Sequence, residues 1–277
     1  MIKTLLTLTL FALTGCAGIL PPAERAALAN NIAMQHSLKP KLLGNTMPLQ
    51  AFYRPQALQQ DHVRVYIEGD GFAYVTSSVP SPDPTPTNPI TLRLAAADMS
   101  PNVLYLARPC QFTKQHQKNC PQKFWTTHRY SREAVEIYHQ ILNNLKQQYA
   151  VKTFDLVGYS GGGVIAAVLT AERDDITALR TVASNLDVAA FIQHHRISAM
   201  SHSLNPTDYA QKLKNIPQKH FAGAEDAIVV PDIIRAYINK INGNASYLDV
   251  MEGAEHSGPW HEHWPNLLAK PLQSNKN

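Results

Sequence analysis

Apolar residues recur along the chain in short runs, and stretches of helical periodicity separate the later ones. The short runs are rich in β-branched and aromatic residues and predict strands at Leu49–Tyr53, Val63–Ile67, Val103–Ala107, Thr153–Val157, Leu179–Ala183, His220–Ala222 and Ser246–Val250. The clearest helix is predicted after Ser131, a good N-cap, with one apolar face that continues to Leu145. Further helices are predicted near Thr91–Ala97, from Gly161 to about Arg173, and after Asn205-Pro206 and Pro231-Asp232.

Strands that alternate with helices predict an α/β domain with a mostly parallel sheet and helices on both faces. The strands Leu49–Tyr53 and Val63–Ile67 are joined by a short connection, so we expect them to pair antiparallel. Five prolines between Val79 and Pro89 predict a stiff, extended surface loop inserted within this domain. We expect one domain over residues 46–268, followed by a flexible tail over residues 269–277.

The composition is that of a globular protein. With 44% hydrophobic and 17% charged residues in 277, the chain is neither disordered nor a multi-span membrane protein. The net charge is +4, but the charges are scattered and form no basic run with interleaved aromatic residues. A nucleic-acid partner is therefore not expected.

The beginning of the chain has the pattern of an export signal. Lys3 precedes an apolar run from Leu5 to Leu13, which is shorter than the roughly 20 residues needed to span a bilayer. The run ends in Leu13-Thr14-Gly15-Cys16, which resembles the lipobox of bacterial lipoproteins. That resemblance implies a signal peptide over residues 1–15 and acyl chains on Cys16. The alternative is an ordinary signal peptide with a chance cysteine.

A lipidated Cys16 implies a place in the cell envelope. Two or more acyl chains hold a protein stably to a membrane. Ala17 follows the cysteine, where an aspartate would imply retention at the inner membrane, so the periplasmic face of the outer membrane is expected. Residues 16–45 are then expected to form a tether with a docking helix.

Cys110 and Cys120 remain as an even pair once Cys16 is set aside. An oxidising compartment favours a disulfide between them. Two free thiols or a metal pair are the alternative, but no C-x-x-C spacing or cluster of partner ligands supports a metal site.

A candidate nucleophile lies in the middle of the chain. Gly158-Tyr159-Ser160-Gly161-Gly162 matches G-x-S-x-G, in which glycines allow a serine to sit on a strained turn between a strand and a helix. A buried-type strand precedes the motif and an apolar helix follows it, as that geometry requires. Ser160 is therefore the predicted nucleophile, and it needs a base and an orienting acid.

The acid and the base are predicted from chain order and from positions after strands. His256, in the loop after the last predicted strand, is the expected base. Asp226 follows the strand at His220–Ala222 and is the favoured acid, because site residues gather at the carboxyl ends of parallel strands. Glu225 and Asp187 are the competing acids.

Two backbone N–H groups are expected to bind the oxyanion. One is the N–H of Gly161, directly after the nucleophile, and the other is that of Asp70 or Gly71 in the loop after Val63–Ile67. Glu68 also stands in this loop. An acidic side chain there hinders oxyanion formation unless it is turned away or paired.

Histidines near the end of the chain raise a metal alternative. His261 and His263 flank Glu262, but no further carboxylate or cysteine has suitable spacing, so surface histidines are favoured. The pair His194-His195 is interpreted in the same way. No metal and no cofactor are expected.

The order Val-Tyr-Ile-Glu-Gly-Asp-Gly at residues 65–71, Gly-Tyr-Ser-Gly-Gly at 158–162, then Asp226 and His256 resembles the α/β-hydrolase superfamily and, more narrowly, its exported bacterial lipoprotein members. The resemblance implies the α/β-hydrolase fold, with an antiparallel N-terminal strand, and a Ser-Asp-His triad. It implies a membrane-anchored serine hydrolase that cleaves an ester or related acyl bond of a small-molecule or lipid-like substrate. A serine peptidase of the same fold and a catalytically inactive binding lipoprotein are the alternatives.

Specificity is expected to arise from insertions at the carboxyl edge of the sheet. The candidates are the proline-rich loop, the Cys110–Cys120 segment with Phe124 and Trp125, and a small cap from Asp187 to Asn205.

Overall fold

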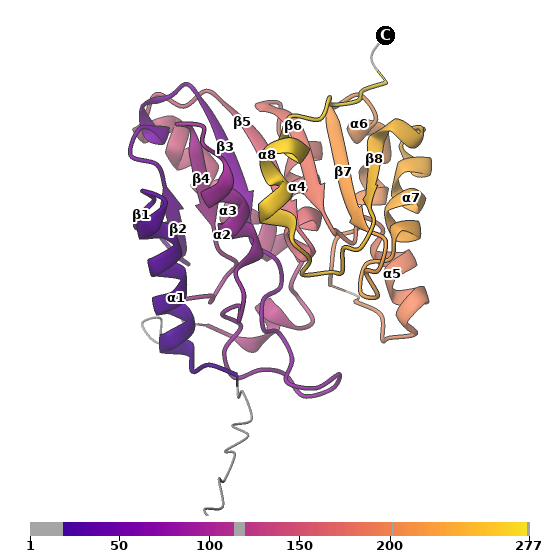
Figure 1. Cartoon of the computed structure of the whole chain (residues 1–277), viewed down its shortest axis with the longest axis horizontal. Helices are drawn as coiled ribbons and strands as arrows, with labels where there is room; N and C mark the ends of the chain where they lie inside the picture. Colours follow the sequence, from indigo (N-terminus) through magenta and orange to yellow (C-terminus); the bar gives the residue numbers. More distant parts are fainter. Residues whose placement is uncertain (1–18, 114–119, 201, 276–277) are drawn as a thin grey trace, which may run out of the picture.

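A mixed sheet runs through the centre of the protein, in a computed structural model that describes residues 19–113, 120–200 and 202–275 (Figure 1). Within those residues the sheet has eight strands in the order β1-β2-β4-β3-β5-β6-β7-β8. Their bounds are β1 (Lys39–Leu43), β2 (Leu49–Tyr53), β3 (His62–Ile67), β4 (Val103–Leu106), β5 (Thr153–Tyr159), β6 (Ile176–Val182), β7 (Gln218–Gly223) and β8 (Leu248–Met251). Strands β3 to β8 are parallel, and β2 is antiparallel to both β1 and β4.

The expected pairing of Leu49–Tyr53 with Val63–Ile67 is wrong. Strand β4 lies between them, so β2 pairs with β4, and β3 has the parallel partners β4 and β5 on its two sides. Val65, Tyr66 and Ile67 are all fully buried. A strand that is buried on both faces is typical of the interior of a parallel sheet. The antiparallel pairing is therefore found at the edge of the sheet, where β1 and β2 lie.

Helices cover both faces of the sheet (Figure 1). One face carries α3 (Arg132–Gln148), α4 (Gly161–Glu172) and α7 (Pro231–Lys240), and the other carries α1 (Pro22–Gln35), α2 (Ile90–Ala97) and α8 (Trp260–Leu268). The smaller helices are α5 (Val188–His195) and α6 (Ala210–Leu213), and 3-10 turns occur at Ala57–Gln59, Gln122–Trp125, Pro206–Tyr209 and Ala245–Tyr247. Each helix in the described part of the chain is too short or too polar to cross a lipid bilayer.

Residues assigned to a tether contribute to the folded domain. Helix α1 buries Ala29, Ile32 and Ala33, and β1 pairs with β2 over its whole length. The hydrophobic pattern missed β1 because it is an edge strand with charged and exposed positions and a proline, which suit an edge. The expected signal peptide and Cys16 lie outside the described residues.

The proline-rich loop is more buried than expected. Ser81, Asp83, Pro84, Thr85 and Pro86 are buried, so the prediction of a surface loop is wrong for this part. The Arg25 guanidinium of α1 donates to the carbonyls of Asp83 and Thr85, and the Trp125 indole N–H donates to the Ser81 carbonyl at 3.0 Å. These donors satisfy backbone oxygens that water satisfies in a surface loop.

Cys110 and Cys120 form the expected disulfide, with their Cα atoms 5.5 Å apart. Cys110 is fully buried and packs in a small cluster with Ala73, Phe124 and Trp125. The disulfide therefore closes a loop within the segment after β4, and the apolar cluster packs this segment against Ala73 of the loop after β3.

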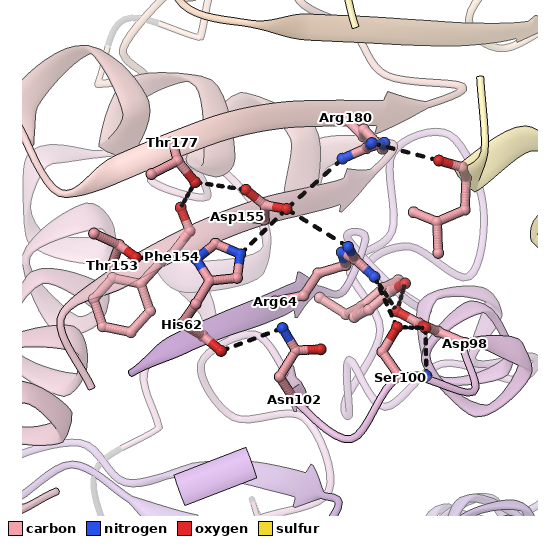
Figure 2. A network of polar contacts seen from close by, with 12 residues as sticks. His62, Arg64, Asp98, Ser100, Asn102, Thr153, Phe154, Asp155, Thr177 and Arg180 are labelled. Atoms are coloured by element: carbon pink, nitrogen blue, oxygen red, sulfur yellow. Dashed lines mark hydrogen bonds and ion pairs between the residues drawn. The ribbon is translucent and has the colours of Figure 1, made fainter. Parts of the chain in front are cut away.

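A charged network joins three central strands on the face covered by α2 and α8 (Figure 2). Asp155 of β5 lies within 3.6 Å of Arg64 on β3 and within 3.9 Å of Arg180 on β6. Arg64 also donates to Asp98, which follows α2, at 2.7 Å. Burial alone raises the pKa of Asp98, but hydrogen bonds from Ser100 and the Arg64 charge bring it below its ordinary value. Asp155 and Arg64 lie in the first half of their strands, away from the carboxyl ends, and the network ties α2 to the sheet.

Candidate active site

Ser160 occupies the sharp turn between β5 and α4, with a φ of 50° in the left-handed region. The glycines around it are required by close packing. A Cβ on Gly158 would lie 2.4 Å from the Cα of Gly163, and a Cβ on Gly162 would lie 2.2 Å from the carbonyl oxygen of Ile67. The strand, the turn and the helix therefore approach too closely for any side chain, as in a nucleophile elbow.

The structure brings Ser160, His256 and Asp226 together. The His256 Nε2 atom lies 3.1 Å from Ser160 Oγ, and the Nδ1 atom lies 2.8 Å from Asp226 Oδ2. The other Asp226 oxygen accepts the backbone N–H groups of Ile228 and Val229 at 2.8 and 2.7 Å. An ionised carboxylate only accepts hydrogen bonds, so Nδ1 carries the proton and Nε2 accepts from the serine hydroxyl.

The acid and the base come from neighbouring strands. Asp226 follows β7 and His256 follows β8, and these strands are parallel neighbours. The two loops approach closely at Gly223, where a Cβ would lie 2.2 Å from the Ala254 carbonyl oxygen. This close approach brings a buried carboxylate within reach of the imidazole.

The competing acids have other surroundings. The Asp187 carboxylate accepts the backbone N–H of Ala190 at 3.0 Å and so caps α5. Glu225 is exposed on the surface. Asp226 is therefore the carboxylate that contacts His256.

Two side chains that the sequence analysis did not single out hold His256 in place. The Tyr159 hydroxyl and the Trp260 indole N–H donate to the His256 carbonyl at 3.2 and 2.9 Å. Burial raises the pKa of Tyr159 well above its ordinary value, which keeps this donor protonated. Tyr159 occupies the variable position of the G-x-S-x-G motif, directly before Ser160. Its closeness to the base could therefore have been predicted from the sequence.

Backbone donors for an oxyanion lie beside Ser160. Gly161 is the first residue of α4, so its N–H has no acceptor within the helix. The N–H groups of Asp70 and Gly71 donate to no acceptor within the described residues. Asp70, Gly71 and Ser160 line the same cavity, so a second donor is available from the Asp70–Gly71 turn.

Glu68 is buried and its carboxylate is paired by hydrogen bonds. Its carboxylate accepts the Gly69 backbone N–H at 2.9 Å, the Thr91 hydroxyl at 2.7 Å and the Tyr105 hydroxyl at 3.1 Å. Burial raises the pKa of Glu68 above its ordinary value. Its hydrogen bonds join the loop after β3 to α2 and to β4, which is a structural role.

Asp70 is the acidic side chain that lies close to the nucleophile. Its carboxylate accepts from the guanidinium groups of Arg108 and Arg129 at 3.1 and 3.0 Å and from the Tyr130 hydroxyl at 2.7 Å. Burial alone raises the pKa of Asp70, but the charges of Arg129 and Arg108 bring it below its ordinary value. These three partners form no motif in the sequence, although Arg108 lies just beyond a strand, at the carboxyl edge.

The cavity above Ser160 has a volume of about 460 Å³. That size suits a small ligand or an acyl chain. Its wall combines the apolar side chains Ala73, Tyr74, Ile90, Phe191, Ile228 and Val229 with the polar side chains Arg129, Tyr130, Asn185 and His256. The proline-rich loop contributes Pro86 and the segment expected as a cap contributes Phe191, whereas Phe124 and Trp125 support the loop from behind.

The histidines of the metal alternative do not gather. Within the described residues, no group of three or more histidine, cysteine or acidic side chains is placed to hold a metal ion. His195 instead donates from Nε2 to the Ile228 carbonyl at 2.7 Å, which ties α5 to the loop that carries Asp226.

Comparisons with known proteins identify the fold. A family described as an alpha/beta hydrolase of unknown function (DUF915) matches residues 126–228, which include Ser160 and Asp226. An esterase from Pyrococcus furiosus superimposes with a TM-score of 0.57 at 13% identity, covering 91% of this chain and 94% of the esterase. The protein has the α/β-hydrolase fold. No curated protein matches its sequence.

Other solved structures share the α/β-hydrolase fold with this chain. An α/β serine hydrolase homologue from Coxiella burnetii has a TM-score of 0.53 and 18% identity, covering 83% of this chain and 93% of that protein. Puromycin hydrolase has a TM-score of 0.57 and 14% identity over 84% of this chain, which spans 38% of its length. At these identities the likeness concerns the fold, and the chemistry has to be argued from the site.

Proposed function

We propose that this protein is a serine hydrolase that cleaves an ester or related acyl bond through an acyl-enzyme. The observation that carries the proposal is the continuous contact from Ser160 Oγ through the His256 imidazole to the buried Asp226 carboxylate. The esterase and serine hydrolase neighbours support it at the level of the fold.

The geometry suits a two-step reaction. Ser160 attacks the substrate carbonyl while His256 Nε2 takes the hydroxyl proton, and Asp226 stabilises the imidazolium that forms. The oxyanion is held by the N–H of Gly161 and an N–H of the Asp70–Gly71 turn. His256 returns the proton to the leaving group, and a water molecule activated by the same imidazole then hydrolyses the acyl-enzyme.

We place this activity in the cell envelope. The Leu13-Thr14-Gly15-Cys16 sequence supports acylation of Cys16, and a lipid there anchors the domain at the periplasmic face of the outer membrane. The mass of the N-terminal peptide from purified protein tests this part, because an acylated Cys16 is heavier by its acyl chains than an unmodified one.

Substitution of the nucleophile tests the reaction. Ser160→Ala is expected to remove turnover of nitrophenyl esters and labelling by a fluorophosphonate probe, while the thermal unfolding curve stays close to that of the wild type. Ser78→Ala, which changes an exposed serine in the loop after β3, is the matched control and is expected to retain both signals. Turnover that persists in Ser160→Ala refutes the role of Ser160 as the nucleophile. A wild type that neither turns over the esters nor reacts with the probe refutes the proposal and favours an inactive binding protein.

The bond type and the acyl length require a second experiment. An ester and an amide with the same acyl group are compared, and the ester is expected to react faster because its leaving group needs less assistance from His256. A preference for the amide favours the peptidase alternative. A series of nitrophenyl esters of increasing chain length then measures how much of the cavity the acyl group fills.

A further inference from the structure

The first turn of α1 lies at the active-site end of the molecule. The Arg25 guanidinium binds the carbonyls of Asp83 and Thr85 and stacks 5.4 Å above the centre of the Phe72 ring. Phe72, Asp83 and Thr85 belong to the loop after β3, and Tyr74 and Pro86 of the same loop line the cavity around Ser160. In Figure 1 the start of α1 and this loop both lie at the lower end of the molecule, where the parallel strands end.

The distance from Cys16 to this end is short. An extended chain spans at most about 3.6 Å per residue, so Ile19 lies within about 11 Å and Pro22 within about 22 Å of Cys16. The part of the expected tether that precedes the helix spans only residues 16–21, because α1 begins at Pro22. A lipid on Cys16 holds the active-site end of the domain close to the membrane surface.

Exposed apolar side chains occur on the segments at this same end. Each of these side chains is 42–55% exposed. We call them the apolar rim, which consists of Ile19, Leu20, Val75, Val79, Ile197 and Ile228. Ile228 lines the cavity, and Val75 and Val79 are paired across a tight turn next to Tyr74, with the Val75 N–H donating to the Val79 carbonyl at 2.8 Å. Ile197 follows α5, which lies at the lower right in Figure 1.

We propose that the apolar rim docks on the lipid bilayer, so that the cavity opens towards the membrane and Ser160 acts on acyl esters carried in it. The inference rests on the proposed hydrolase activity and on lipidation of Cys16. The anchor brings this end of the domain to the bilayer, and partly exposed aliphatic side chains gain by burial at the boundary between headgroups and acyl chains.

The orientation is measured in the full-length lipidated protein. Single cysteines are introduced as Val79→Cys on the rim and Met99→Cys after α2, which is exposed but outside the rim. Each is labelled with a fluorophore while the Cys110–Cys120 disulfide stays oxidised. In vesicles of phosphatidylethanolamine and phosphatidylglycerol with spin-labelled lipid, fluorescence at position 79 is expected to be quenched several-fold more than at position 99. Equal quenching, or stronger quenching at position 99, overturns the inference.

Turnover separates this inference from the proposed function. The double variant Val75→Asp with Val79→Asp is expected to hydrolyse soluble nitrophenyl acetate like the wild type, but to lose about tenfold in rate on a long-chain nitrophenyl ester dissolved in vesicles. Met99→Asp is the matched control and is expected to keep both rates. Equal rates of the double variant and the control on vesicles refute docking, whereas a wild type inactive on both esters refutes the hydrolase.

Discussion

The carboxylate of Asp70 lies directly beside the backbone of Gly161, where a Cβ on the glycine would be 2.1 Å from Asp70 Oδ1. A negative charge is therefore close to the N–H that we expect to bind the oxyanion. Such a charge opposes the charge that develops on the substrate oxygen. Arg108 and Arg129 neutralise it, and Tyr130 donates a third hydrogen bond to the same group.

Asp70→Asn is expected to destabilise the protein by about 3–5 kcal/mol, because it removes the carboxylate from a largely buried ion cluster and leaves two guanidinium groups facing an amide. Urea unfolding measures the change in free energy. Asp232→Asn is the matched control, since its pair with Arg235 is exposed and its loss is expected to cost at most about 1 kcal/mol. Similar changes in the two variants contradict the assigned role of Asp70.

Asp226→Asn is expected to lower turnover by about four orders of magnitude with little effect on folding, as an amide facing His256 Nδ1 favours the wrong tautomer. The Asn oxygen can still accept the N–H groups of Ile228 and Val229, so the loop keeps its shape. Rates on a nitrophenyl ester provide the measurement. Glu225→Gln changes the neighbouring exposed acid and is expected to leave the rate unchanged. A larger loss of turnover in Glu225→Gln than in Asp226→Asn would contradict the assignment of Asp226 as the acid.

Removal of the disulfide through Cys110→Ser with Cys120→Ser is expected to lower the free energy of unfolding by about 2.5–3 kcal/mol. The reason is the greater conformational entropy of an unfolded chain that no longer closes a loop of sequence separation 10. Urea titrations with and without a reductant measure it. The reductant is expected to lower the free energy of unfolding of the wild type towards that of the double variant and to leave the double variant unchanged. A wild type whose free energy of unfolding does not change with the reductant contradicts the prediction.

His220 is expected to make stability fall with acid. Burial lowers the pKa of His220 to about 3, while an unfolded histidine titrates near 6.5. Between these values the unfolded chain binds a proton that the folded chain does not, so the free energy of unfolding falls by up to about 1.4 kcal/mol per pH unit as pH drops below about 6.5. His220→Gln is expected to flatten this slope in urea titrations between pH 7 and pH 5. If the slope is unchanged in the variant, groups other than His220 cause the loss of stability in acid.

Local features of the sequence determined most of the strands and the nucleophile turn. A buried-type strand, glycines with no room for a side chain and an apolar helix occur together around Ser160, and their meaning depends on neighbours within a few residues. The N-cap at Ser131 and the proline at the start of α7 are signals of the same kind. The proximity of Asp226 and His256 was predictable because both follow parallel strands, whose carboxyl ends share one edge of the sheet.

The tertiary structure alone decided which distant segments contact one another. The position of β4 between β2 and β3, the burial of the proline-rich loop against Arg25 and the cations around Asp70 join residues separated by tens of positions. Such contacts depend on which surfaces become buried together, and a residue's own neighbours in the chain do not encode that choice. The start of α1 beside the active-site loops is a result of the same kind, and it sets the direction in which an anchor at Cys16 would hold the cavity.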